Sequence, residues 1–88
     1  ASVVRQPSDV VDIAREVAAA FRAKGAEVTV PQSGPILAPV DAAAVRRALA
    51  NLVENAVRYG GQVTIGIEAG ERSATIVVED DGPGIPED

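Results

Sequence analysis

Two asparagines one helical turn apart, Asn51 and Asn55, have the clearest potential for chemistry in this sequence. Glu54 and Arg58 lie in the same stretch, and at about 100° per residue all four side chains fall on one narrow side of a helix. Asparagine is a mediocre helix former because its amide competes for backbone partners. A polar helix face alone is usually only solvated. Two amides beside an acid and a base nevertheless indicate that this face binds something.

A second polar element follows a strand-like run and reads D-D-G-P-G-I over residues 80–85. The carboxylate of Asp80, at the end of that strand, can accept hydrogen bonds from a ligand. Gly82 and Gly84 lack side chains, so the backbone can turn tightly and approach a ligand closely. The alternative interpretation is a tight turn that closes an acidic strand end.

Hydrophobic periodicity predicts the elements that position these two segments. An amphipathic helix is expected over residues 9–23 with Ser8 as its N-cap, and a second helix over 41–59, opened by Asp41 and closed by two glycines. Alternating patterns predict strands over residues 2–5, 27–30, 36–38, 63–67 and 74–78. The order β-α-β-β-α-β-β predicts a two-layer α/β sandwich, with two helices on one face of a mixed sheet.

The second helix also has a broad apolar face opposite the asparagines. We expect this face to lie against the sheet. It comprises Val45, Ala48, Leu49, Leu52, Val53 and Ala56.

Composition and charge exclude several classes of function. The 88 residues suffice for one small domain, whose core must come from Val, Ile, Leu and Ala because there is only one Phe and one Tyr. The formal net charge of −5 argues against nucleic acid or an anionic membrane surface as the main partner. No apolar run approaches the roughly 18 residues of a membrane span, and no signal peptide is evident. We therefore expect a cytoplasmic segment without direct membrane contact.

Two absent residue types narrow the chemistry further. The sequence has no cysteine, which excludes disulfides and thiol catalysis within it. It has no histidine either, so it holds no imidazole base, no histidine metal ligand and no histidine that could accept a phosphoryl group.

Together, the two polar segments resemble the N box and the first glycine box of the sensor histidine kinases of two-component signal transduction. The first match reads N-L-x-x-N-A-x-x-Y from Asn51 to Tyr59, and the second reads D-x-G-x-G-I from Asp80 to Ile85. Either motif alone would be weak, but both in this order are specific. The resemblance implies an incomplete Bergerat-type ATP-binding fold, in which residues 1–88 are the N-terminal part of the domain. The lid, the second glycine box and the final strands have no counterpart here.

The resemblance also implies ATP and Mg²⁺ as cofactors. It places Mg²⁺ on the Asn55 amide, the phosphates near Arg58 and the adenine ring against Tyr59. It also implies that Asp80 accepts a hydrogen bond from the exocyclic amine of adenine, which distinguishes adenine from guanine, and that Ile85 lines an apolar slot. Asn51 stands where hydrolytic relatives have a glutamate that activates water, which favours phosphoryl transfer over hydrolysis. Glu54 is a candidate base or a solvated acid, so no catalytic residue is firmly assigned. The residues expected to bind the nucleotide are Asn51, Asn55, Arg58, Tyr59, Asp80, Gly82, Gly84 and Ile85.

The implied reaction of the parent kinase is transfer of the γ-phosphoryl group of ATP to a histidine on a separate helical domain, with ADP as product and a response regulator downstream. The parent is expected to be membrane-anchored. The 88 residues alone are expected to be inactive, to bind nucleotide weakly, to expose apolar surface and to self-associate. Two alternatives stay open: an anti-sigma serine kinase of the same superfamily, and a non-catalytic α/β interaction module.

Overall fold

The computed structural model describes residues 6–58, 61–71 and 73–80. In these residues the predicted order of strands and helices is confirmed. The first predicted strand, over residues 2–5, lies outside the described residues, and the first strand observed begins at Gln6. The elements are β1 (Gln6–Asp9), α1 (Val10–Arg22), β2 (Val28–Thr29), β3 (Leu37–Val40), α2 (Ala42–Arg58), β4 (Val63–Ala69) and β5 (Ala74–Asp80).

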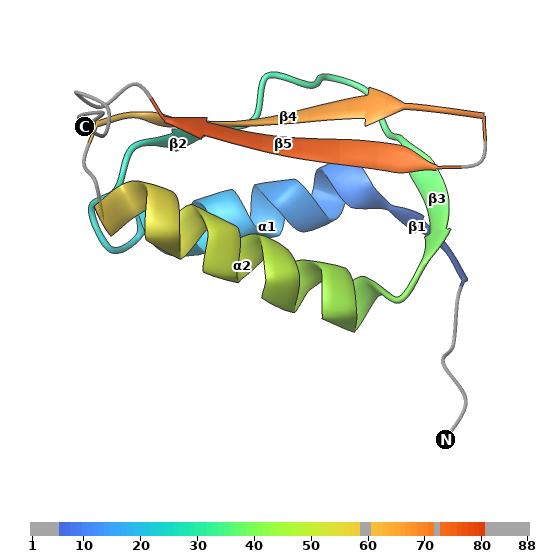
Figure 1. The fold of residues 1–88 in the computed structure, drawn as a ribbon, viewed down its shortest axis with the longest axis horizontal. Coiled ribbons are helices and arrows are strands. Elements are labelled where there is room, and N and C mark those ends of the chain that lie inside the picture. The colour runs from blue at the N-terminus through green and yellow to red at the C-terminus, as the bar shows by residue number, and fades with distance from the viewer. Residues whose placement is uncertain (1–5, 59–60, 72, 81–88) are drawn as a thin grey trace, which may run out of the picture.

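The larger sheet has the strand order β2-β4-β5 and is mixed, since β2 runs parallel to β4 and β5 runs antiparallel to it. Both helices cover the same face of this sheet (Figure 1). The predicted two-layer arrangement is therefore confirmed. β1 and β3 do not join that sheet; they pair with each other as a separate antiparallel ribbon, with Pro7 opposite Pro39. Proline donates no hydrogen bond from its backbone nitrogen, so a short two-stranded ribbon accommodates both residues.

The core lies between the sheet and the two helices. Alternate residues of β4 point into it, and Val63, Ile65 and Ile67 are each at most 2% exposed. α1 contributes an i, i+3, i+4 stripe, whereas α2 contributes fewer residues. Neither described helix is long and apolar enough to cross a membrane. The buried residues of the helices are Val10, Val11, Ile13, Ala14, Val17 and Ala18 in α1, and Leu49, Val53 and Ala56 in α2.

The start of α1 differs from the prediction. Ser8 was expected to cap this helix, but Ser8 belongs to β1, opposite Ala38, and Asp9 is the N-cap. The Asp9 carboxylate accepts hydrogen bonds from the backbone N–H groups of Val11, at 3.0 Å, and of Ile36, at 3.2 Å. The second bond ties the helix start to the segment before β3. Asp9 is therefore favoured as the N-cap, because its carboxylate accepts hydrogen bonds both from the first turn of α1 and from the distant Ile36 N–H.

A side-chain amide continues the sheet where β2 stops. β2 ends at Thr29, and the Gln32 amide then pairs with β4: it donates to the Ile67 carbonyl at 2.6 Å and accepts from the Ile67 N–H at 3.1 Å. Arg15 of α1 donates to the Gln32 backbone carbonyl at 2.7 Å. These bonds hold the 31–35 connection against both layers, and they satisfy backbone groups on the β2 side of β4.

Candidate functional site

The helix that carries the asparagines is capped as predicted at its start. The Asp41 carboxylate accepts hydrogen bonds from the N–H groups of Ala43 and Ala44, at 3.1 and 3.2 Å. The helix is described as far as Arg58; the predicted last residue, Tyr59, lies outside the described residues, and Gly61 has a φ of +88°. Such a φ favours glycine, because a side chain would clash with the backbone there. The sequence therefore predicts the start of α2 correctly.

Asn51, Asn55 and Arg58 all lie on the solvent-exposed side of α2. Neither asparagine amide has a hydrogen-bond partner within the described residues. The Arg58 guanidinium lies 3.8 Å from the Glu54 carboxylate, one turn earlier, and the Arg58 side chain is 70% exposed. On one face of α2, the two asparagine amides thus have no hydrogen-bond partner among the described residues, and Arg58 makes one long ion pair.

Asp80 lies at the same end of the molecule as the last turn of α2. It occupies the last position of β5, opposite Val63 in the β4–β5 ladder, and a short connection joins Arg58 to Val63. The end of β5 and the end of α2 therefore come together (Figure 1). Asp80 is exposed, as expected for a residue that binds a ligand from solvent. The remaining predicted binding residues lie outside the described residues: Tyr59, Gly82, Gly84 and Ile85.

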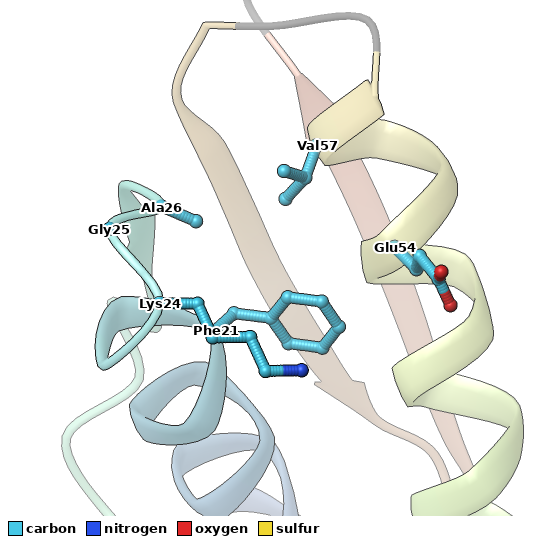
Figure 2. Close-up of a pocket in the computed structure, with 6 residues that line it drawn as sticks. All are labelled: Phe21, Lys24, Gly25, Ala26, Glu54 and Val57. Atoms are coloured by element: carbon cyan, nitrogen blue, oxygen red, sulfur yellow. The ribbon is translucent and has the colours of Figure 1, made fainter.

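Glu54 faces a different part of the surface. It lines a pocket of about 380 Å³ between the ends of the two helices. In Figure 2, Glu54 and Val57 of α2 lie across this pocket from Phe21 and Lys24 at the end of α1. Asn55 lies on the far side of the helix from Val57, at about 160° around the axis. Among the described residues that were predicted to bind or to act as a base, only Glu54 lines this pocket, and its carboxylate also lies 3.8 Å from the Arg58 guanidinium.

An apolar groove borders the asparagine face on its other side. It has a volume of about 260 Å³ and lies between α2 and β5. Leu52, which was predicted to face the core, is 50% exposed, and Ala48 is exposed as well. These two predictions of burial are wrong because β5 is the edge strand of the described sheet and leaves that flank of α2 uncovered. The groove is lined by Val45, Ala48, Leu49, Leu52, Ala74 and Ile76.

Arg47 belongs to the same helix face but was not among the predicted site residues. It is exposed and lies four residues before Asn51. That spacing is the sequence signal that could have identified it, because side chains four residues apart are neighbours on a helix surface.

The donor set of this face suits a metal-bound polyphosphate. Within the described ranges, no group of three or more His, Cys, Asp or Glu side chains could hold a metal ion. The exposed amide oxygen of Asn55 could serve as one ligand of a metal ion whose other ligands are phosphate oxygens and water. Mg²⁺ accepts that pattern, since it usually keeps few protein ligands alongside substrate phosphates. Arg58 adds a charge-assisted donor for phosphate oxygens.

Comparisons with known proteins agree with the resemblance in the sequence. Residues 40–88 match the family model described as histidine kinase-, DNA gyrase B- and HSP90-like ATPase. The chain is 41% identical over 44 residues, half of its length, to the sensor histidine kinase GtrS of Pseudomonas aeruginosa. It is 33% identical to the signal transduction histidine-protein kinase AfsQ2 of Streptomyces coelicolor, in an alignment of 91 positions that covers the whole chain. It spans 9% of GtrS and 17% of AfsQ2.

A solved structure agrees with the fold. The ATP-binding domain of PrrB from Mycobacterium tuberculosis superposes with a TM-score of 0.81 at 24% identity, over 94% of this chain and 64% of that one. The family match covers the whole of α2, β4 and β5, and therefore every predicted site residue. From the motifs, the fold and the family model together, the chain belongs to the histidine kinase-, DNA gyrase B- and HSP90-like ATPase family.

Proposed function

We propose that this chain is the N-terminal part of the ATP-binding domain of a sensor histidine kinase, and that Mg-ATP binds between α2 and the end of β5. The observation that supports this most strongly is the pair of exposed amides on Asn51 and Asn55, at the end of the molecule where β5 delivers Asp80. Asn55 and Asp80 are 25 residues apart in sequence, and the elements that carry them end at the same end of the molecule (Figure 1).

Each described residue has a role that follows from its chemistry. The amide oxygen of Asn55 is a neutral, hard ligand on a rigid helix, suited to Mg²⁺. When bound, Mg²⁺ would offset the negative charge of the phosphates. In the proposed complex, the Arg58 guanidinium leaves Glu54 and contacts the phosphate oxygens. Loss of the Arg58–Glu54 ion pair costs little free energy, because exposed ion pairs contribute little to stability. Asp80 accepts a hydrogen bond from the adenine amine. Tyr59 and Ile85 contact the base, and Gly82 and Gly84 let the backbone approach it.

The proposed reaction is phosphoryl transfer to a histidine of a separate helical domain. Asn51 cannot act as a general base, and the sequence holds no histidine of its own. The chain would therefore position the nucleotide and stabilise charge, rather than activate water. The two curated relatives are both histidine kinases by name, which supports this acceptor over the serine of an anti-sigma factor. A response regulator would act downstream, and the segment would lie in the cytoplasm within a membrane-anchored parent.

The test is the Asn55→Ala variant of the intact kinase that contains this segment. We expect Mg-dependent ATP affinity to fall at least about a hundredfold, because the proposed protein ligand of the metal is removed. Isothermal titration calorimetry with Mg-ATP, and with ATP in EDTA, separates metal-dependent from metal-independent binding. The matched control is Asp12→Ala, an exposed polar residue on α1. Unchanged Mg-ATP affinity in the Asn55→Ala variant would remove the metal assignment.

A further inference from the structure

Arg47 differs from every other basic side chain in the described part of the chain. It makes no hydrogen bond, ion pair or ring contact there. The others are all engaged. Arg15 and Arg22 donate to backbone carbonyls, Lys24 lies 5.2 Å from the Phe21 ring centroid, Arg46 pairs with Glu16 at 3.4 Å, and Arg58 pairs with Glu54. In a chain with a net charge of −5, an unpaired cation is unexpected, because acidic side chains outnumber basic ones.

Arg47 also lies on the line of residues that the proposed nucleotide site uses. Arg47, Asn51 and Arg58 fall within about 40° of one another around the helix axis, with Asn55 beside them. Along the axis, Arg47 precedes Asn51 by about 6 Å and Asn55 by about 12 Å, at 1.5 Å per residue. Asp80, where the adenine is proposed to bind, lies near the C-terminal end of α2, and Arg47 lies nearer the N-terminal end of that helix (Figure 1). Arg47 therefore lies beyond the phosphate end of the site.

The direction of the side chains separates Arg47 from the nucleotide. Helical side chains lean towards the N-terminus of their helix. Arg58 therefore leans towards Asn55 and the phosphates, whereas Arg47 leans away from Asn51. The residues near Arg47 on the helix have short side chains, since Ala43, Ala44 and Ala48 are all exposed alanines. The Arg47 guanidinium is therefore accessible to a macromolecule that approaches the γ-phosphoryl group of the proposed nucleotide.

We propose that Arg47 binds a carboxylate on the protein segment that carries the phosphoryl acceptor and so positions that segment at the nucleotide. This inference rests on the proposed function. Charge complementarity selects the partner group, since a guanidinium binds a carboxylate through two parallel hydrogen bonds. The many acidic side chains of this chain repel an acidic segment, so Arg47, the unpaired cation of the described residues, favours its approach at this point of α2. Arg47 is a positioning residue, because it contacts neither the nucleotide nor the reacting atoms.

The experiment compares Arg47→Ala, Arg47→Glu and Arg47→Lys variants of the intact kinase. Two quantities are measured: the dissociation constant of Mg-ATP, and the single-turnover rate of phosphoryl transfer to the acceptor histidine at saturating Mg-ATP. We expect Arg47→Ala to lower the transfer rate about tenfold, the size of one lost charge-assisted hydrogen bond. The Mg-ATP dissociation constant should stay within about twofold. Arg47→Glu should lower the rate further by repulsion, and Arg47→Lys should fall between wild type and Arg47→Ala.

Two further readouts exclude a merely structural effect. The transfer rate should depend less on ionic strength in Arg47→Ala than in the wild type, because a screened charge pair has been removed. Lys24→Gln is the control, since it removes the same charge from the end of α1 and should leave both quantities unchanged.

Three outcomes are decisive. A transfer rate in Arg47→Glu equal to that of the wild type would overturn the inference. A loss of Mg-ATP affinity as large as the loss of rate would assign Arg47 to the nucleotide instead, and would overturn it too. Failure of the unsubstituted kinase to bind Mg-ATP would refute the proposed function itself. That failure is distinguishable because it appears before any Arg47 variant is made.

Discussion

α1 and α2 pack on the same face of one sheet, but they bury different shares of their surface. α1 buries six apolar residues, and its arginines 15 and 22 donate to backbone carbonyls of the 31–35 connection and of β2. α2 is the longer helix, yet it buries only Leu49, Val53 and Ala56. Its remaining surface exposes Leu52, two asparagines and an unpaired arginine. α1 therefore contributes more to the core, whereas α2 leaves a larger share of its surface exposed to solvent.

The strands beneath the helices explain the difference. α1 contacts β2 and β4, and α2 contacts β4 and β5. The inward residues of β4 are almost fully buried, while Ala74, Ile76 and Val78 of β5 are only partly buried. The edge strand thus leaves one flank of α2 uncovered, and the predicted exposed apolar surface is present at Leu52 and along the groove. Self-association through this surface stays a prediction.

The largest expected effect contrasts the two leucines of α2. Leu49 is 2% exposed and Leu52 is 50% exposed. Leu49→Ala should lower the free energy of unfolding of the 88-residue chain by about 2–5 kcal/mol, through lost burial and a cavity. Leu52→Ala should lower it by less than about 1 kcal/mol. Urea unfolding followed by circular dichroism measures both. Equal losses would mean that both flanks of α2 are packed and would remove the contrast between the helices.

A smaller effect is expected at the two helix starts. Asp41 caps only α2, so Asp41→Ala should lower the free energy of unfolding by about 1 kcal/mol. Asp9 caps α1 and also accepts the Ile36 N–H, so Asp9→Ala should lower it by about 1–3 kcal/mol. Urea midpoints of the two variants test the order. A larger loss for Asp41→Ala would show that α1 is not the more firmly anchored helix.

The smallest effect concerns the two ion pairs. Arg46 and Glu16 join the two helices at 3.4 Å, whereas Arg58 and Glu54 lie 3.8 Å apart on α2 alone. Double-mutant cycles should give coupling energies below about 1 kcal/mol for both, and both should weaken in high salt. The Arg46–Glu16 coupling should be the larger, because its side chains are less exposed. A stronger Arg58–Glu54 coupling would argue against an arginine that is readily released to phosphate.

Features of the fold that depend on residues close together in the sequence were predicted correctly. The two helices, the β4–β5 hairpin and the exposed asparagine face all follow from periodicity, capping residues and motif spacing. Predictions that depended on distant contacts were less accurate. Ser8 matches the preferences of an N-cap, but pairing of β1 with β3 placed it in a strand and gave the role to Asp9. The Gln32 amide that continues β2 has no local signal, since its partner is 35 residues away.

The positions of the described candidate residues were predicted more accurately than their surroundings, and their role in binding stays a prediction. Asn51, Asn55 and Arg58 are exposed on one face, and Asp80 ends β5, as the motifs indicated. Exposed apolar surface was predicted, but its position at Leu52 was not, because helix periodicity identifies an apolar face but not how much of it a sheet edge covers. Arg47 was missed because a single exposed arginine is ordinary until its neighbours are seen to be paired.

The most direct test of the central claim is an amide chemical-shift titration of this 88-residue chain with Mg-ADP, which detects weak binding. Binding between α2 and the end of β5 predicts shift changes concentrated at Asn51, Asn55, Arg58 and Asp80, with little change at the N-terminal turns of α1. The same titration of the Asn55→Ala variant should lose the magnesium-dependent changes. Shift changes confined to the β1–β3 ribbon, or none at millimolar Mg-ADP, would contradict a nucleotide site on this face.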